Sequence, residues 1–198
     1  MRFGRRVGII GDVHGADGLL TRALAACRAA GVETVALLGD LFDRLEQADA
    51  VARALDGWHI VGVRGNHERE ALLATSGEQR DIRPATAALL CSLQDRVILD
   101  DVCLVHEEDG WGRHDPVATL FGGSGWLSTR HYPAWITFAG HTHVRHARDE
   151  RSPLDIGRGS VTLVPYRRYL INPGALVNGQ FAIWDREGSE VKFCDLKG

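Results

Sequence analysis

Short apolar runs recur along the first third of the chain, and each is followed by glycine and by polar residues of types that bind metal ions. The three runs with the letters that follow them are Val7–Ile10 before GDVHG, Thr34–Leu38 before GD, and His59–Val63 before RGNHE. Apolar runs of this length next to glycine are typical of buried strands. Helical sequence lies between them, and this alternation predicts parallel strands joined by helical crossovers in an α/β fold.

The segments between the strands show the spacing of helices. Leu20, Leu24 and Cys27 recur at helical intervals after Asp17, which we expect to cap the helix, and Gly31 is expected to end it. We predict further helices over residues 48–55, 70–76 and 85–93.

The pattern is looser after Glu68. Residues 97–105 predict a strand that is bent or broken near Asp100-Asp101, and shorter strands are expected at 135–138 and 169–171. Asn178-Gly179 is a strong signal for a two-residue hairpin turn. A second turn at Glu187-Gly188 would complete an antiparallel meander that runs through Phe193.

Length and composition restrict the class of protein. A chain of 198 residues suits one domain, so we predict a single domain over residues 1–198. A net charge of −3 argues against binding to duplex nucleic acid or to an anionic membrane. The first apolar run stops at Ile10, and no window is long enough to span a membrane, so we expect a cytoplasmic protein.

The four cysteines are widely spaced and form no C-x-x-C pair. This spacing argues against a disulfide framework or a zinc ribbon, and we expect buried, reduced thiols.

The strand ends supply a set of candidate metal ligands, because the carboxyl ends of parallel strands meet at one edge of a sheet. Further ligands follow later apolar runs, including two histidines in the stretch AGHTHVRH over residues 139–146. The candidates are Asp12, His14, Asp40, Asn66, His106, His141 and His143. Carboxylate, amide and imidazole ligands without thiolate suit Mn²⁺, Fe or Zn²⁺. The set exceeds what one ion uses and predicts two ions bridged by a shared carboxylate.

Five motifs together resemble the signature motifs of the calcineurin-like metallophosphoesterases, in that family's order. They are GDVHG at 11–15, GDLFDR at 39–44, RGNHE at 64–68, the strand-terminal His106, and GHTH at 140–143. The resemblance implies a four-layer α/β/β/α sandwich of two mixed β-sheets flanked by helices, with the metals at one end. The compact chain is similar to small bacterial-type phosphodiesterases and phosphatases.

The resemblance also implies a division of labour. Asp12, His14, Asp40 and His143 would hold the first metal, and Asp40, Asn66, His106 and His141 the second, so that Asp40 is the bridge. Mn²⁺ is the first expectation, with Fe, Zn²⁺, Ni²⁺ and Co²⁺ as alternatives. A metal-bridging hydroxide would attack phosphorus.

Three further residues have expected roles in the reaction. His67 would protonate the leaving group as general acid. By similarity to the phosphoprotein-phosphatase branch, Asp43 would orient His67 and Arg44 would grip a phosphate oxygen.

The expected function is metal-dependent hydrolysis of phosphate monoesters or diesters, with a small phosphoester or nucleotide-type substrate. Two enzymatic alternatives are a dinucleoside polyphosphate hydrolase and a Ser/Thr-type protein phosphatase. A non-catalytic metal-binding scaffold is the competing class, and the presence of His67 with all the candidate ligands favours an enzyme. No oligomeric state is predicted.

Two features leave alternatives open. Glu107, next to His106, would either place negative charge near the substrate or turn outwards. The segment Gly110 to Pro133, rich in glycine and aromatic residues, would be either a substrate flap or a connection anchored by buried aromatic side chains.

Overall fold

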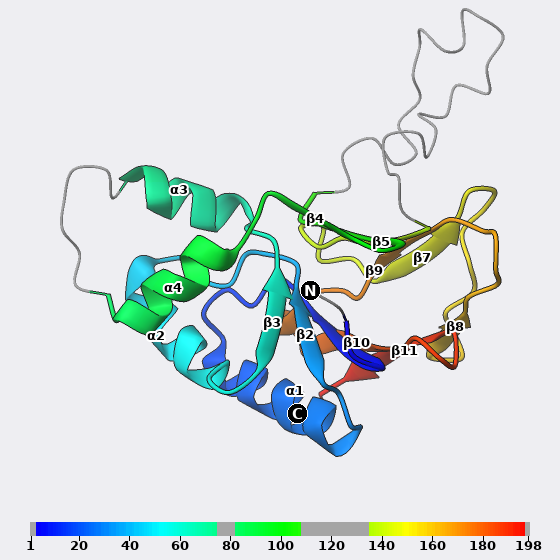
Figure 1. The fold of residues 1–198 in the computed structure, drawn as a ribbon, viewed down its shortest axis with the longest axis horizontal. Coiled ribbons are helices and arrows are strands. Elements are labelled where there is room, and N and C mark those ends of the chain that lie inside the picture. The colour runs from blue at the N-terminus through cyan, green and yellow to red at the C-terminus, as the bar shows by residue number, and fades with distance from the viewer. Residues whose placement is uncertain (1–2, 75–81, 108–134, 197–198) are drawn as a thin grey trace, which may run out of the picture.

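The protein folds into two stacked β-sheets with helices packed on one of them (Figure 1). The computed structural model describes residues 3–74, 82–107 and 135–196. The first sheet has the strand order β3-β2-β1-β10-β11-β8, and the second has the order β4-β5-β6-β9-β7. The sheets approach each other at the edge where Val63, just after β3, bridges to Gln94, just before β4.

The first sheet combines a parallel half with an antiparallel half. Its parallel strands are β1 (Arg6–Ile10), β2 (Thr34–Leu37) and β3 (His59–Gly62). On the other side of β1, the antiparallel strands are β10 (Gln180–Asp185), β11 (Glu190–Asp195) and β8 (Ser160–Thr162). Because β1, β2 and β3 are parallel, the loops that follow them emerge at the same edge.

The second sheet is also mixed. Its strands are β4 (Arg96–Leu99), β5 (Val102–Val105), β6 (Ile136–Phe138), β9 (Tyr169–Asn172) and β7 (His146–Asp149). Strands β5, β6 and β9 are parallel, whereas β4 and β7 pair with them in the antiparallel sense.

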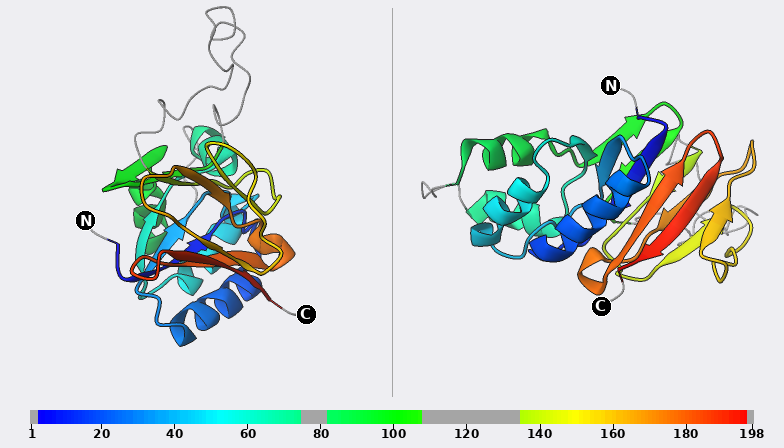
Figure 2. Two further views of the ribbon diagram at one scale, coloured as in Figure 1. Left: turned by 90° about the vertical axis from the view of Figure 1, so that its right-hand side faces the viewer. Right: turned by 90° about the horizontal axis from the view of Figure 1, so that it is seen from below.

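The helices gather on one side of the molecule. They are α1 (Asp17–Ala29), α2 (Leu45–Ala54), α3 (Asn66–Ala74), α4 (Pro84–Ser92) and the short 3₁₀ turn η2 (Leu176–Asn178). Figure 2, in its right-hand view, shows α1 in blue along one face of the first sheet. Within the described ranges, the outer face of the second sheet carries only a small apolar cluster of Cys103, Val105, Ala139 and Leu170.

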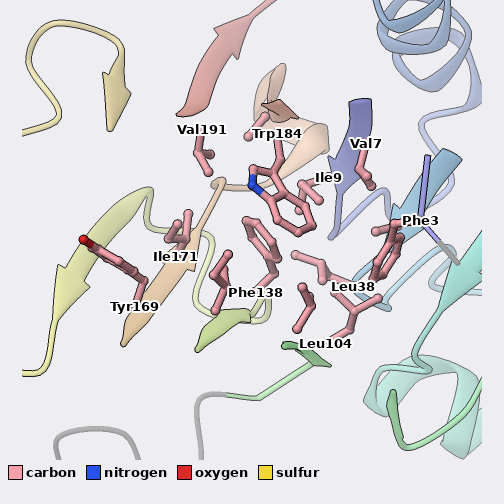
Figure 3. Packing of buried hydrophobic residues seen from close by; sticks show 14 of the residues in the cluster. Phe3, Val7, Ile9, Leu38, Leu104, Phe138, Tyr169, Ile171, Trp184 and Val191 are labelled. Carbon is pink, nitrogen blue, oxygen red and sulfur yellow. The ribbon is translucent and has the colours of Figure 1, made fainter. Parts of the chain in front are cut away.

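Alternation along the strands divides the apolar residues between two cores. In β1, Val7 and Ile9 point into the cluster between the sheets, whereas Ile10 packs with the helices. The cluster between the sheets includes Phe138 and Trp184, whose rings lie 5.5 Å apart (Figure 3). The second cluster joins the first sheet to α1, α2 and α4. Strands β1 and β2 are therefore buried on both faces, which explains why they read as continuous apolar runs.

The structure confirms the predicted architecture of two mixed sheets with flanking helices. The parallel strands β1 to β3 and the break at Asp100-Asp101 lie where the sequence predicts them. The turn at Glu187-Gly188 joins β10 to β11, also as predicted.

Several local predictions are wrong. Ala16, not Asp17, occupies the N-cap of α1, and Asp17 is the first helical residue. Helices α2 and α3 begin three and four residues earlier than predicted, at Leu45 and Asn66. Cys91 is exposed, although Cys27 and Cys103 are buried as expected.

The Asn178-Gly179 prediction also needs correction. These residues end a 3₁₀ turn between β9 and β10, which belong to different sheets, so they form no hairpin. Gly179 adopts the left-handed backbone that the dipeptide favours, with φ of 77°. The dipeptide thus predicts the local turn, whereas long-range pairing decides which strands it joins.

No helix among the described residues is both long enough and apolar enough to cross a membrane.

Candidate metal centre

The candidate ligands come together at one end of the sandwich. Asp12 and His14 follow β1, Asp40 follows β2, and Asn66 begins α3 after β3. From the second sheet, His106 follows β5, and His141 and His143 follow β6. Strands β5 and β6 run parallel to each other. Both sheets therefore deliver polar side chains from the carboxyl ends of parallel strands.

One group of ligand atoms contains Asp12, His14 and His143. The Nε2 atoms of His14 and His143 lie 3.0 Å apart, and His143 Nε2 is 3.5 Å from Asp12 Oδ1. Asp12 is fully buried, whereas the two histidines are partly exposed. The three residues therefore combine one buried carboxylate with two partly exposed imidazole rings.

A second group contains Asp40, His106 and His141. His106 Nε2 lies 3.2 Å from Asp40 Oδ2, 3.1 Å from Asn66 Oδ1 and 3.2 Å from His141 Nδ1. Asp40 and His106 are buried, and His141 is exposed. The two groups contain the histidines in the same partition that the family resemblance implies.

The local bonding of this donor set fits cations. Asp12 Oδ2 is buried and has no hydrogen-bond partner among the described residues, which is costly for a carboxylate unless something positive neutralises it. His106 Nδ1 lies 2.7 Å from the carbonyl oxygen of Leu38 and can donate its proton there. That bond would leave the Nε2 lone pair facing Asp40 and Asn66, an arrangement typical of metal-binding histidines.

Burial and neighbouring charges shift the pKa values of Asp12, Asp40 and His106. Burial raises the pKa of Asp12, although His106 opposes the effect. Burial acts upwards on Asp40 as well, but the hydrogen bond and charge of His106 outweigh it, so the pKa of Asp40 is lowered. Conversely, burial disfavours the charged form of His106, and the contact with Asp40 nevertheless raises its pKa. Of the two aspartates, Asp12 is therefore the one whose charged form its surroundings favour less.

His67, Asp43 and Arg44 lie beside the candidate ligands. Asp43 Oδ1 is 2.5 Å from His14 Nδ1 and 3.6 Å from His67 Nδ1. His67 Nε2 is 4.0 Å from Asp40 Oδ2, and the His67 backbone N–H donates to Asp40 Oδ1. Asp43 therefore contacts His14 more closely than His67. Arg44 is the N-cap residue of α2 and lines a pocket of about 330 Å³ together with Asp43 and His67.

Two glycines allow the loops to approach each other. A Cβ atom on Gly65 would lie 2.0 Å from Asp40 Oδ1. Gly39 has a φ of 91°, and a Cβ atom there would lie 2.5 Å from the Gly65 backbone nitrogen. A larger residue at Gly65 would displace the Asp40 carboxylate, and one at Gly39 would displace the Gly65 backbone and the His106 ring, which explains glycine in both motifs.

Glu68 is a supporting residue to which the sequence analysis assigned no role. It is buried, and its carboxylate accepts hydrogen bonds from the backbone N–H groups of Asp40 at 2.9 Å, Leu41 at 2.7 Å and Gly65 at 2.7 Å. Burial is the largest influence on Glu68 and raises its pKa. The only sequence signal was its place in the RGNHE motif. Glu68 ties the loop that carries Asp40 to the loop that carries Asn66.

Replacing Glu68 with Gln is expected to lower the free energy of unfolding by about 1–3 kcal/mol, because the amide NH₂ would face a backbone N–H that now meets a carboxylate oxygen. The melting temperature of the chelator-treated protein measures the loss, at about 2–4 °C per kcal/mol for a chain of this size. Glu70→Gln, an exposed change in the same helix, is the control. Equal melting temperatures for the two variants would contradict the role given to Glu68.

The backbone of the site is strained. A positive φ is found at the candidate ligands Asp12 (55°), His14 (49°), Asp40 (51°), His141 (68°) and His143 (57°). The left-handed region costs L-residues other than glycine about 1–2 kcal/mol. Such strain is common at functional sites, where contacts with the surrounding structure keep the backbone in the strained conformation.

His143→Gly is expected to raise the melting temperature of the chelator-treated protein by about 2–4 °C, because glycine relieves about 1 kcal/mol of backbone strain. Metal affinity should fall at the same time. His146→Gly, in strand β7, is the matched control and should melt lower than the unmodified protein, because glycine weakens a strand. A fall in melting temperature for His143→Gly would show that the backbone there is not strained.

The sequence left two features open, the direction of the Glu107 side chain and the role of the segment Gly110 to Pro133, and the structure describes only the first. Glu107 is half-buried, and its Oε1 atom lies 3.5 Å from Nη1 of Arg69 in α3. This contact partly neutralises the carboxylate beside the site. The segment Gly110 to Pro133 lies outside the described residues.

The chain is similar to known proteins in sequence and in fold. It matches the model of the calcineurin-like phosphoesterase superfamily domain over residues 6–185. Serine/threonine-protein phosphatase 1 of Salmonella typhimurium (strain LT2) is 35% identical over 77 residues, which are 38% of this chain and 35% of that protein. This match spans about a third of the curated relative's length.

Two solved structures share the fold across nearly the whole chain. A metallophosphoesterase from Sphaerobacter thermophilus has a TM-score of 0.68 and 23% identity, over 98% of this chain and 88% of that one. An archaeal phosphodiesterase has a TM-score of 0.56 and 22% identity, over 96% of this chain and 99% of that one.

Proposed function

Because the chain belongs to the calcineurin-like phosphoesterase superfamily and is a phosphoric ester hydrolase, we propose that it acts as one catalytic domain that uses two divalent cations. The observation that carries the proposal is the convergence of carboxylate, amide and imidazole groups from five loops. Two of the three candidate ligand groups among the described residues consist of these residues, and the third joins His14 to Asp43 and His67. Asp12, His14, Asp40 and His143 would hold one cation. Asp40, Asn66, His106 and His141 would hold the other.

When bound, such cations lower the pKa of coordinated water towards neutrality and polarise phosphoryl oxygens. The donor set suits Mn²⁺ first, with Fe, Zn²⁺, Ni²⁺ and Co²⁺ as alternatives. The buried Asp12 carboxylate, with one oxygen unpartnered among the described residues, supports a cation at the first site.

The residues around the ligands would handle the substrate and its proton. His67 is about one-third exposed and lies next to Asp40, so its imidazole is accessible both to solvent and to a group bound at the ligands. We assign it the transfer of a proton to the departing oxygen. Asp43, with contacts to His14 and His67, would keep both rings oriented. Arg44 would bind a phosphoryl oxygen from the wall of the adjoining pocket.

Phosphate monoesters are the favoured substrate class. The curated relative is named a serine/threonine-protein phosphatase, and Asp43, Arg44 and His67 line the pocket beside the ligands. An arginine at this place suits a monoester, because its phosphoryl group has three non-bridging oxygens, against two in a diester, and guanidinium binds phosphoryl oxygens with paired hydrogen bonds. Diesters and dinucleoside polyphosphates are the alternatives, since ligands alone do not select a substrate.

The test is Mn²⁺-supported hydrolysis of p-nitrophenyl phosphate, bis-p-nitrophenyl phosphate and diadenosine tetraphosphate by one preparation. The proposal predicts that the monoester is cleaved fastest and that a chelator removes the activity. Faster cleavage of either other substrate would overturn the monoester assignment. Absence of all three activities in a protein that retains its metal would contradict a catalytic role and favour a scaffold.

A further inference from the structure

A second cavity lies at the opposite end of the sandwich from the candidate ligands. Its volume is about 740 Å³, within the usual range for a small-molecule site. Its walls include Arg5, just before β1, Trp135, just before β6, and Tyr169, the first residue of β9. The candidate ligands follow the other ends of β1 and β6. Strand β1 alone, at about 3.3 Å per residue, separates the two regions by on the order of 15 Å.

Aromatic side chains form an open wall of this cavity. Tyr166 is 88% exposed and Trp135 is 42% exposed, and their rings meet edge to face at 6.4 Å. Tyr166 also has a φ of 65°, a backbone conformation that is rare for a bulky residue. The Arg168 guanidinium lies over the Trp135 ring, with its Cζ atom 5.6 Å from the centroid, so the exposed Tyr166 ring is the main surface on which another planar ring can stack.

Trp184 also belongs to the cavity wall. Trp184 is 97% buried, being only 3% exposed, and its indole Nε1 has no hydrogen-bond partner among the described residues. In Figure 3 this nitrogen points towards the side of Val191 and Ile171, away from Phe3. Neither Val191 nor Ile171 lines the cavity, so this N–H faces the apolar cluster between the sheets, and Trp184 contributes only its ring to the cavity wall.

The charged residues of the wall favour an anion. They are Arg5, Arg167 and Arg186 against Asp101 and Glu187. The arginines have partners: Arg5 Nε is 2.9 Å from Glu187, and Arg167 Nη1 is 3.0 Å from Asp149. Each guanidinium has five N–H donors, so these groups can also donate to a ligand's anionic oxygens.

We propose that this cavity binds a small planar aromatic compound that carries an anionic group, such as a mononucleotide or an aromatic carboxylate. The ring would stack on Tyr166 beside Trp135, and the anionic group would bind the guanidinium groups. This site is separate from the metal centre and does not depend on the proposed reaction.

Two-dimensional ¹H–¹⁵N NMR of the Zn²⁺-loaded full-length chain tests the proposal, with excess inorganic phosphate added to compete at the metal centre. The probes are indole-3-acetate and the non-hydrolysable methylene phosphonate analogue of AMP, with adenosine as the uncharged control. The proposal predicts that at least one anionic probe shifts the Trp135 and Trp184 indole N–H signals saturably, and that adenosine binds more weakly. Binding of indole-3-acetate would identify an aromatic carboxylate as the ligand, and binding of the AMP analogue would identify a mononucleotide.

Two variants locate the site without disturbing the fold. Tyr166→Asn removes the ring and keeps a residue that tolerates positive φ, and it should weaken binding about fivefold. Arg5→Gln should weaken the anionic probe and leave adenosine unchanged. Ile98→Ala, a half-exposed change on β4 away from the cavity wall, is the control. Unshifted indole signals with both anionic probes, equal binding of adenosine, or unchanged binding in both variants would overturn the proposal.

Discussion

Replacing Asp40 with Asn is expected to lower kcat for p-nitrophenyl phosphate by about a thousandfold or more, a loss on the scale of removing one central electrostatic group from an active site. Asp40 is the residue proposed to hold both cations. Its Oδ2 atom lies 3.2 Å from His106 Nε2, and its Oδ1 atom accepts the backbone N–H of His67. An amide at this position loses the negative charge that two neighbouring cations would share.

The fold should survive this change. Asn has nearly the same shape as Asp and tolerates the positive φ of 51° found at Asp40. Metal content by elemental analysis and kcat are the two readouts, with Asp155→Asn, an exposed position, as the matched control. If the Asp40 variant keeps two metals per chain and full activity, Asp40 is not the bridge.

Replacing His67 with Asn is expected to reduce kcat about a hundredfold or more for alkyl phosphates, and much less for p-nitrophenyl phosphate. Nitrophenolate leaves readily without a proton, whereas an alkoxide needs one. Metal content should not change, because His67 lies outside the two proposed ligand sets. Its imidazole Nε2 lies 4.0 Å from Asp40 Oδ2.

The slope of log kcat against the pKa of the leaving alcohol separates the possible roles of His67. The slope should become steeper in the His67 variant if the imidazole supplies the proton. Asp43→Asn should show a weaker form of the same change, because Asp43 contacts His67 only at 3.6 Å. A parallel loss for good and poor leaving groups would assign His67 to binding rather than proton transfer.

Much of the site could be predicted from the sequence, because strand direction determines at which edge of the sheet the residues after each strand lie. Each apolar run that ends in glycine and a polar residue marks the carboxyl end of a strand, and parallel strands bring these ends together. Asp12, Asp40 and Asn66 are predicted in this way to lie near one another. The structure brings them to the edge where β1, β2 and β3 end.

Other features depend on contacts that no local pattern carries. Glu68 has its role only because its carboxylate meets the backbone of Asp40, Leu41 and Gly65 in the folded chain. The left-handed backbone at His141 and His143 is imposed by the surrounding loops, since neither residue prefers it.

The two missed strands have a similar explanation. Strand β7 reads HARD and strand β8 spans only three residues, and both lie at sheet edges. Edge strands are short and often polar, so they lack the apolar run that marks a buried strand. Their position follows from pairing with β9 and β11.

The most direct test of the central claim is an anomalous difference map from crystals of the full-length protein grown with Mn²⁺. Two peaks per chain are predicted, about 3.5–4 Å apart as in other two-metal sites, one beside Asp12, His14 and His143 and the other beside Asn66, His106 and His141. Asp40 should contact both. A single peak, or two peaks that do not share Asp40, would contradict the account.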